Sequence, residues 1–236
     1  MPPIVASPDL TALANKFGSD KGDHIGDAHN YARLYSFLFG GFREQPFSML
    51  EIGLQIGIQN QTALANRVST TAPSVGMWLE FFPRAHIYGV DISDFSALNG
   101  LPRFTFFRCD VGSREMLSAL KRSTPPLRIV VDDGSHCPYH QQVALSELFE
   151  KVTPGGLYII EDLHWHNREV DPTLPPAPRT EDIFQQYLAT GILDSPVFSE
   201  STRSFIQAQI ANVFVHWDNR GGTDLWTIKM IAIQRK

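Results

Sequence analysis

Five short apolar runs recur along the middle of the chain, and stretches with helical spacing separate them. The runs cover residues 47–52, 86–90, 104–109, 127–131 and 156–160. Each is rich in Ile, Val, Phe or Tyr and is bounded by Gly, Pro or Asp, as expected for strands buried on both faces of a parallel sheet. Apolar residues at helical spacing lie between them, over 75–82, 114–121 and 140–150. This alternation predicts right-handed crossovers and a doubly wound, Rossmann-like α/β sheet.

The two ends of the chain depart from this alternation. Strand-like runs over 213–217 and 225–233 flank the turn-rich segment 218–224, which predicts a C-terminal antiparallel hairpin and a sheet of seven strands in all. Before the first strand, apolar residues at helical spacing predict two helices that end near Gly18 and Gly40. We therefore expect an N-terminal helical cap over residues 1–45 and a single globular domain over residues 46–236.

The composition of the chain limits the kinds of molecule that the protein is expected to bind. The 236 residues suffice for one α/β domain with a buried core, and the formal net charge of −5 argues against a nucleic-acid-binding protein. The sequence contains no apolar run of roughly 18 residues, so no membrane span is expected. Residues 1–8 lack the basic and apolar regions of a signal peptide, and two cysteines fit a reducing compartment. We expect a cytoplasmic protein with a small-molecule substrate, and its apolar N-terminal segment would permit a homo-oligomer.

Ligands of doubly wound sheets bind beyond the carboxyl ends of the strands. Gly53 and Gly57 follow the first strand, and glycine allows close approach of the backbone to a ligand. Their spacing lacks the middle glycine of the dinucleotide fingerprint, which argues against a nicotinamide enzyme, and a purely structural turn is the alternative. Asp91 ends the second strand, where a carboxylate accepts hydrogen bonds from ribose hydroxyls. The nearby Asp94 is better placed to cap the next helix.

The third strand also ends in a carboxylate. Asp110 could accept a hydrogen bond from the amino group of an adenine, and a helix-capping role is the alternative. Glycine and two aspartates at three consecutive strand ends together predict an adenosine-binding crevice. The Pro-rich segment 171–178, after the fifth strand, is interpreted either as a substrate-side flap or as a surface connection.

The fourth and fifth strands carry the most informative residues. Asp132 and Asp133 follow the fourth strand, and Glu161 and Asp162 follow the fifth. Because neighbouring strands lie about 4.8 Å apart, we expect the carboxylates of Asp133, Glu161 and Asp162 to converge. Their mutual repulsion would be relieved by a hard cation, and oxygen ligands favour Mg²⁺. The alternative is that one carboxylate caps a helix while the others are solvated at the rim.

His136 lies three residues after Asp133, within reach of the same space. Histidine exchanges protons readily near neutral pH, so His136 is a candidate general base for a substrate hydroxyl. His164, Trp165 and His166 follow the acidic pair and could line the acceptor site, although a position on the rim explains them equally well.

With these residues assembled, the chain resembles the metal-dependent sugar O-methyltransferases of natural-product biosynthesis, the mycinamicin 2''-O-methyltransferase group. The resemblance rests on six blocks: Gly18-Ser-Asp-Lys21, Leu50-Glu-Ile-Gly53, Met77-Trp-Leu-Glu-Phe-Phe-Pro83, Ile87-Tyr-Gly-Val-Asp-Ile92, Asp132-Asp-Gly-Ser-His136 and Gly155-Gly-Leu-Tyr-Ile-Ile-Glu-Asp162. The last two are the most specific. The chain differs from that group in the polar insertion 58–74.

The resemblance implies a class I methyltransferase that uses S-adenosylmethionine. It implies Mg²⁺ held by Asp133, Glu161 and Asp162, with His136 as general base assisted by Asp133. The residues expected to bind the cofactor are Glu51, Gly53, Gly57, Asp91, Ile92, Asp110, Val111 and Asp132. The expected reaction is Mg²⁺-assisted methyl transfer to a hydroxyl of a small molecule such as a glycosylated natural product. The alternatives are a metal-independent N- or C-methyltransferase and a catalytically silent adenosylmethionine-binding module.

Overall fold

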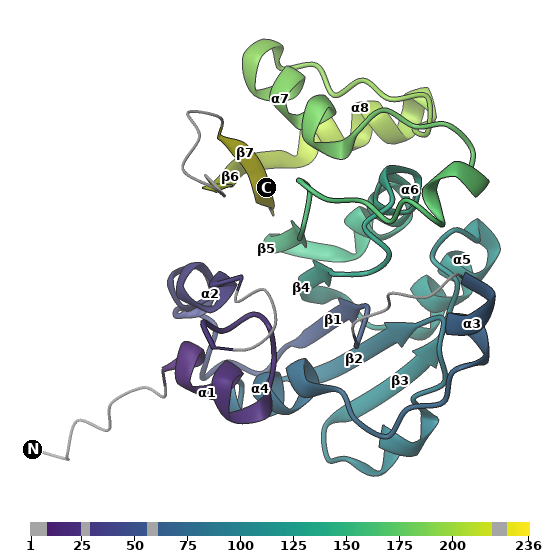
Figure 1. Ribbon diagram of the computed structural model, residues 1–236. Coiled ribbons are helices and arrows are strands. Elements are labelled where there is room, and N and C mark those ends of the chain that lie inside the picture. Colours follow the sequence, from purple (N-terminus) through teal and green to yellow (C-terminus); the bar gives the residue numbers. More distant parts are fainter. Residues whose placement is uncertain (1–8, 25–28, 56–60, 219–225) are drawn as a thin grey trace, which may run out of the picture.

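The computed structural model describes residues 9–24, 29–55, 61–218 and 226–236. Its centre is a seven-stranded sheet with the strand order β3-β2-β1-β4-β5-β7-β6 (Figure 1). The strands are β1 Ser48–Ile52, β2 His86–Asp91, β3 Phe104–Arg108, β4 Leu127–Asp132, β5 Val152–Ile160, β6 Ile210–Asp218 and β7 Thr227–Arg235. β1 to β5 pair in parallel, whereas β7 is antiparallel to both β5 and β6. The predicted Rossmann-like sheet with a C-terminal antiparallel hairpin is confirmed.

One strand begins earlier than its apolar run indicates. β5 starts at Val152, although Pro154 and two glycines precede the apolar residues. The pairing with β4 shifts register between Leu127 and Ile129, and Gly155 has a φ of 73° there. An irregularity of this kind allows residues that disfavour regular strands to remain inside the sheet.

Helices follow most strands, as the alternating pattern predicts. They are α1 Leu10–Phe17, α2 Tyr31–Phe39, α3 Gln61–Asn66, α4 Pro73–Phe81, α5 Arg114–Ser123, α6 Pro138–Leu148, α7 Thr180–Thr190 and α8 Glu200–Gln209, with short 3-10 turns η1 Ser96–Gly100, η2 Phe149–Lys151 and η3 Asp171–Thr173. α1 is capped before its first residue by Asp9, whose side chain accepts a hydrogen bond from the amide of Thr11, and after its last residue by Gly18, which has a φ of 77°. The polar insertion 58–74 contains α3 and the start of α4.

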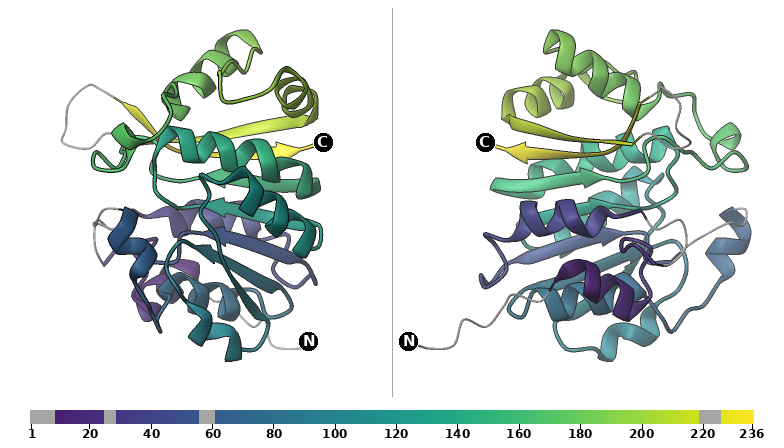
Figure 2. Two further views of the ribbon diagram at one scale, coloured as in Figure 1. Left: turned by 90° about the vertical axis from the view of Figure 1, so that its right-hand side faces the viewer. Right: turned by 60° about the vertical axis from the view of Figure 1, so that its left-hand side comes forward.

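The helices cover both faces of the sheet (Figure 2). α1, α2 and α4 pack on one face, in a core that includes Met49, Ile129 and Val131. α5, α6, α7 and α8 pack on the other face, in a core that includes Leu50 and Val130. Successive strand residues alternate between the two cores, as the period of two requires. The N-terminal helices therefore form part of one layer, and the division of the chain at residue 45 stays a prediction.

The order in which strands are added to the sheet switches sides at β1, although β1 and β4 themselves run parallel. After β1 the chain builds outward to β2 and β3, and it then returns to place β4 on the other side of β1. Such a switch point opens a crevice at the carboxyl ends of the strands, where ligands of doubly wound sheets bind. Within the described ranges, no helix has both the length and the apolar character needed to cross a bilayer.

Candidate active site

A cavity of about 500 Å³ lies at the carboxyl ends of the strands around this switch point. The predicted site residues that line it are Gly53, Asp91, Ile92, Asp110, Val111, Asp133, His136 and Asp162. Glu51, Asp132 and Glu161 are buried but are not among the lining residues. Gly57 lies outside the described residues. The structure thus brings most of the predicted residues to one cavity, and their contact with a bound cofactor stays a prediction.

Gly53 explains how β1 and β4 come together at the cavity. Its φ is 81°, a conformation that other residues rarely adopt. A Cβ at this position would lie 1.9 Å from the backbone oxygen of Asp133. The amide of Asp133 also donates to the carbonyl oxygen of Ile52, at 2.9 Å. The absence of a side chain at Gly53 therefore lets the segment that carries Asp133 pack directly against the end of β1.

Two aspartates line the part of the cavity beyond β2 and β3. Asp91 is 8% exposed, and its carboxylate accepts hydrogen bonds from the amides of Leu54, at 3.0 Å, and Ser93, at 2.7 Å. Asp110 accepts from the amide of Gly112, at 2.8 Å, while the side chain of Ser113 caps α5. Ser113, and not Asp110, is therefore the residue that caps α5. Carboxylate oxygens have further lone pairs, so both aspartates can still accept hydrogen bonds from a ligand.

Glu51 lies beneath this region in a buried polar network. Its carboxylate accepts hydrogen bonds from the hydroxyl of Ser74, at 2.8 Å, and from the indole of Trp78, at 3.0 Å. Burial raises the pKa of Glu51 to about 7, against the lowering effects of Lys21 and Trp78. In this arrangement Glu51 joins β1 to α4.

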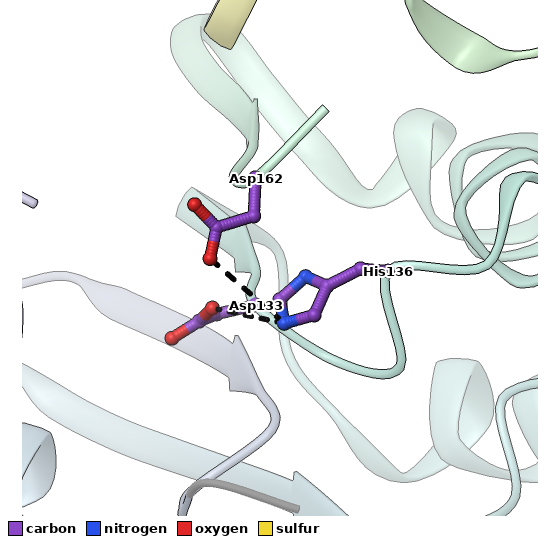
Figure 3. A group of neighbouring side chains, drawn as sticks. All are labelled: Asp133, His136 and Asp162. Carbon is purple, nitrogen blue, oxygen red and sulfur yellow. Dashed lines mark ion pairs between the residues drawn. The ribbon is translucent and has the colours of Figure 1, made fainter. Parts of the chain in front are cut away.

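One carboxylate after β4, that of Asp133, and one after β5, that of Asp162, meet at His136 (Figure 3). The Nε2 atom of His136 lies 4.0 Å from Oδ1 of Asp133 and 4.0 Å from Oδ2 of Asp162. One ligand atom from each of these three residues lies within 4.8 Å of the others, a grouping that can hold a metal ion. The Nδ1 atom of His136 is buried and has no hydrogen-bond partner among the described residues. The predicted approach of Asp133 to Asp162, with His136 in the same space, is thus present, whereas Glu161, the third carboxylate expected there, is not part of this group.

Backbone strain coincides with this group. His136 has a φ of 58° and Asp162 a φ of 52°, both in the left-handed region. Residues other than glycine adopt this region at a cost of about 1–3 kcal/mol and do so most often at functional sites. The arrangement of these two side chains beside Asp133 therefore has a cost in local stability.

Donors from the N-terminal segment hold one oxygen of each aspartate in place. The hydroxyl of Tyr31 donates to Oδ1 of Asp162, at 2.6 Å, and the ammonium of Lys21 donates to Oδ2 of Asp133. In each carboxylate the remaining oxygen is the one that faces His136. The N-terminal helical segment therefore orients the aspartates that line the cavity.

Glu161 takes a different place from its neighbour Asp162. Its Oε1 accepts from the hydroxyl of Tyr35 and its Oε2 from the ammonium of Lys21, at 2.9 Å. It is 1% exposed, and its oxygens are not part of the three-residue group at His136. Lys21 and Tyr35 bind the carboxylate of Glu161, whereas Tyr31 binds that of Asp162, so the two neighbouring carboxylates have different partners. Glu161 is therefore linked to Asp133 through Lys21.

Burial affects the pKa values of all three carboxylic acids, Asp133, Glu161 and Asp162. Burial raises the pKa of Asp133, against the opposing charges of Lys21 and His136. Burial and then the charge of Asp133 raise the pKa of Glu161 well above its ordinary value. Burial alone would also raise the pKa of Asp162, but His136, His29 and the bond from Tyr31 hold it below its ordinary value.

Lys21 is the buried cation of this cluster. Burial alone would lower its pKa, but Asp133, Glu161 and Glu51 outweigh that effect and raise the pKa well above its ordinary value. Three carboxylates therefore share the charge of one ammonium.

Residues after β5 form the outer wall of the cavity. His164, Trp165, Asn167 and Val170 line it, whereas none of residues 171–178 does. Trp165 is 47% exposed, and its ring lies edge-on to His136 with a centroid distance of 5.3 Å. The Pro-rich segment is thus better described as a surface connection, and Trp165 presents an exposed aromatic side chain beside the carboxylates.

No protein-family model matches the chain. Among curated proteins, it is 36% identical over 156 residues to the mycinamicin VI 2''-O-methyltransferase of Micromonospora griseorubida, an alignment that covers 66% of this chain and 36% of that enzyme. It is also 36% identical over 156 residues to the 8-demethyl-8-alpha-L-rhamnosyl tetracenomycin-C 2'-O-methyltransferase of Streptomyces olivaceus, over 66% of this chain and 38% of that enzyme. The aligned part is therefore little more than a third of each relative.

Solved structures extend the similarity to nearly the whole chain. MycE methyltransferase from the mycinamycin biosynthetic pathway, in complex with Mg, SAH and mycinamycin VI, matches with a TM-score of 0.72 and 25% identity. That match covers 98% of this chain and 55% of MycE. The chain is therefore similar in sequence to part of these natural-product sugar O-methyltransferases, and it has a Rossmann-like methyltransferase fold that matches about half of MycE.

Proposed function

We propose that this protein transfers the methyl group of S-adenosylmethionine to a hydroxyl of a small glycosylated molecule, with the assistance of Mg²⁺. The observation that carries the proposal is the meeting of Asp133, His136 and Asp162 on the wall of a cavity that also contains Asp91 and Asp110. One cavity thus offers groups suited to an adenosyl moiety and groups suited to a metal-assisted proton transfer. The homology to sugar O-methyltransferases supports the same reaction.

The cofactor is proposed to bind with its adenosyl group near β2 and β3. Asp91 and Asp110 would accept hydrogen bonds from the ribose hydroxyls and the adenine amino group. Ile92 and Val111, which line the same part of the cavity, would contact the adenine. Gly53 leaves room for the backbone near the methionine end, and the buried Glu51 would support this wall through Ser74 and Trp78.

Asp133 and Asp162 are proposed to hold the metal through the oxygens that face His136. Mg²⁺ is commonly bound by one or two carboxylates, with water or substrate oxygens completing its coordination. When bound, it would supply the positive charge that lowers the pKa of an acceptor hydroxyl. Glu161, the third predicted ligand, would take part only by exchanging its bond with Lys21 or Tyr35.

His136 is proposed to accept the proton of the acceptor hydroxyl at Nε2. The acceptor oxygen forms a bond to the methyl carbon as the carbon–sulfur bond of the cofactor breaks, and the proton passes to His136. The edge-on contact with Trp165 limits the freedom of the imidazole ring. Holding the reactants in line accounts for much of the rate in such reactions, because effective molarities reach about 10⁵ M or more.

The test is methyl transfer from radiolabelled S-adenosylmethionine to mycinamicin VI and to a rhamnosylated tetracenomycin, with their aglycones as controls. We expect transfer to a glycosylated acceptor, its loss in EDTA and its recovery with excess Mg²⁺, because the metal activates the hydroxyl. Full activity in EDTA would favour a metal-independent methyltransferase. Cofactor binding without transfer to any hydroxyl, amine or carbon acceptor would indicate a silent binding module.

A further inference from the structure

Lys21, the last residue of the Gly18-Ser-Asp-Lys21 block, has no part in the proposed reaction, although it is buried beside the proposed metal site. It is 1% exposed and lines the cavity. Its ammonium donates to Asp133 and to Glu161, and it lies 4.0 Å from Oε1 of Glu51. Lysine is rarely buried unless it is paired, so its burial here depends on these carboxylates.

The backbone fixes where this ammonium lies. The carbonyl oxygen of Lys21 accepts a hydrogen bond from the amide of Ala32, at 2.9 Å, at the beginning of α2. The amide of Ser19 donates to the carbonyl oxygen of Ala14, also at 2.9 Å, at the end of α1. A lysine on a surface helix can extend its charge into water. Lys21 is instead held between two helices, with its charge directed at the sheet.

The ammonium and the proposed metal would compete for the negative charge of Asp133. Lys21 binds Oδ2 of Asp133, and Oδ1 of the same carboxylate faces His136 and Asp162. Lys21 also binds one oxygen of Glu161. Two cations near one carboxylate repel each other, and the repulsion is stronger in a buried site than in water.

We propose that the ammonium of Lys21 is a built-in counter-cation that sets the metal affinity of the carboxylate cluster, which consists of Asp133, Glu161 and Asp162. It neutralises part of the charge of Asp133 and Glu161, and so weakens the attraction of the cluster for a divalent cation. This inference rests on the proposed function, because it requires that the cluster binds a metal. Lys21 acts through the carboxylates and is therefore a positioning residue.

The test is Mn²⁺ binding to the full chain, measured by electron paramagnetic resonance for the wild type, Lys21→Gln, Lys21→Arg and Lys16→Gln. Glutamine keeps donor hydrogens but removes the charge, and we expect it to bind Mn²⁺ at least about tenfold more tightly. Mn²⁺ should also raise the melting temperature of Lys21→Gln more than that of the wild type. Lys21→Arg and Lys16→Gln should resemble the wild type, because the first keeps the charge and Lys16 pairs with Glu80 on the surface.

Three other outcomes would contradict the proposed role of Lys21. Unchanged or weaker Mn²⁺ binding by Lys21→Gln would indicate a purely structural lysine. Failure of this variant to fold even with excess Mn²⁺ would also contradict the inference, because the metal should replace the missing charge. If the wild type and every variant fail to bind Mn²⁺, the metal in the proposed function is wrong, and the inference about Lys21 falls with it.

Discussion

Asp133→Asn is expected to lower kcat for methyl transfer by about 10²–10³-fold, because a catalytic metal contributes several kcal/mol to the transition state. Asp133 provides one of the two carboxylate oxygens that face His136, and an amide oxygen carries no charge for the metal. The affinity for S-adenosylhomocysteine should change by less than about threefold, which is under about 1 kcal/mol, because Asp91 and Asp110, the residues proposed to bind its adenosyl group, are unchanged. Steady-state kinetics and isothermal titration calorimetry measure the two quantities.

Asp94→Asn provides the matched control. Asp94 is an aspartate that follows β2, and it accepts a hydrogen bond from the amide of Ser96 without lining the cavity. This variant should keep wild-type kinetics. If Asp133→Asn retained full activity, or if both variants lost activity equally, the assignment of Asp133 to the metal would be wrong.

Gly53→Ala is expected to lower the free energy of unfolding by about 2–4 kcal/mol, because it combines a left-handed backbone with a steric clash. The new Cβ would lie 1.9 Å from the carbonyl oxygen of Asp133, so the β1 and β4 ends must separate. Since the same movement displaces Asp133, we expect weaker binding of both S-adenosylhomocysteine and Mn²⁺. Urea denaturation and calorimetry on the folded fraction measure these effects.

Gly100→Ala is the control for this prediction. Gly100 has no heavy atom within 4 Å of an added Cβ, so alanine there should change stability by less than about 0.5 kcal/mol. Wild-type stability and ligand affinity in Gly53→Ala would mean that the close contact between β1 and the Asp133 segment is not required.

The sheet could be predicted from sequence because its signal is local. Buried parallel strands require continuous apolar runs, and each of the runs ending near Ile52, Asp91 and Asp132 became a strand. The early start of β5 could not be predicted, because Pro154 and Gly155 disfavour a regular strand. They are accommodated by a register shift that depends on the partner strand.

The meeting of Asp133 and Asp162 was also predictable, since it follows from the adjacency of β4 and β5. The place of Glu161 was not, because Lys21 and Tyr35 bind its carboxylate. What the sequence did not reveal is how the carboxylates are held. Lys21, Tyr31 and Tyr35 contact them across more than 100 positions of the chain, and no local pattern encodes such contacts. Tyr31 and Tyr35 fit the apolar helical spacing before the first strand, which predicts a helix but no contact with the carboxylates. Tyrosine in place of phenylalanine at buried positions is the signal that could have identified them, because a buried hydroxyl needs a partner.

Anomalous diffraction from crystals grown with S-adenosylhomocysteine and Mn²⁺ would locate the metal and the cofactor in one experiment. We predict a manganese peak between Asp133 and Asp162, beside His136, with the adenosine of the ligand at Asp91 and Asp110 in the same cavity. A ligand in the cavity with manganese absent or bound elsewhere would contradict the metal site. A ligand bound outside the cavity would contradict the proposed cofactor site and the reaction that depends on it.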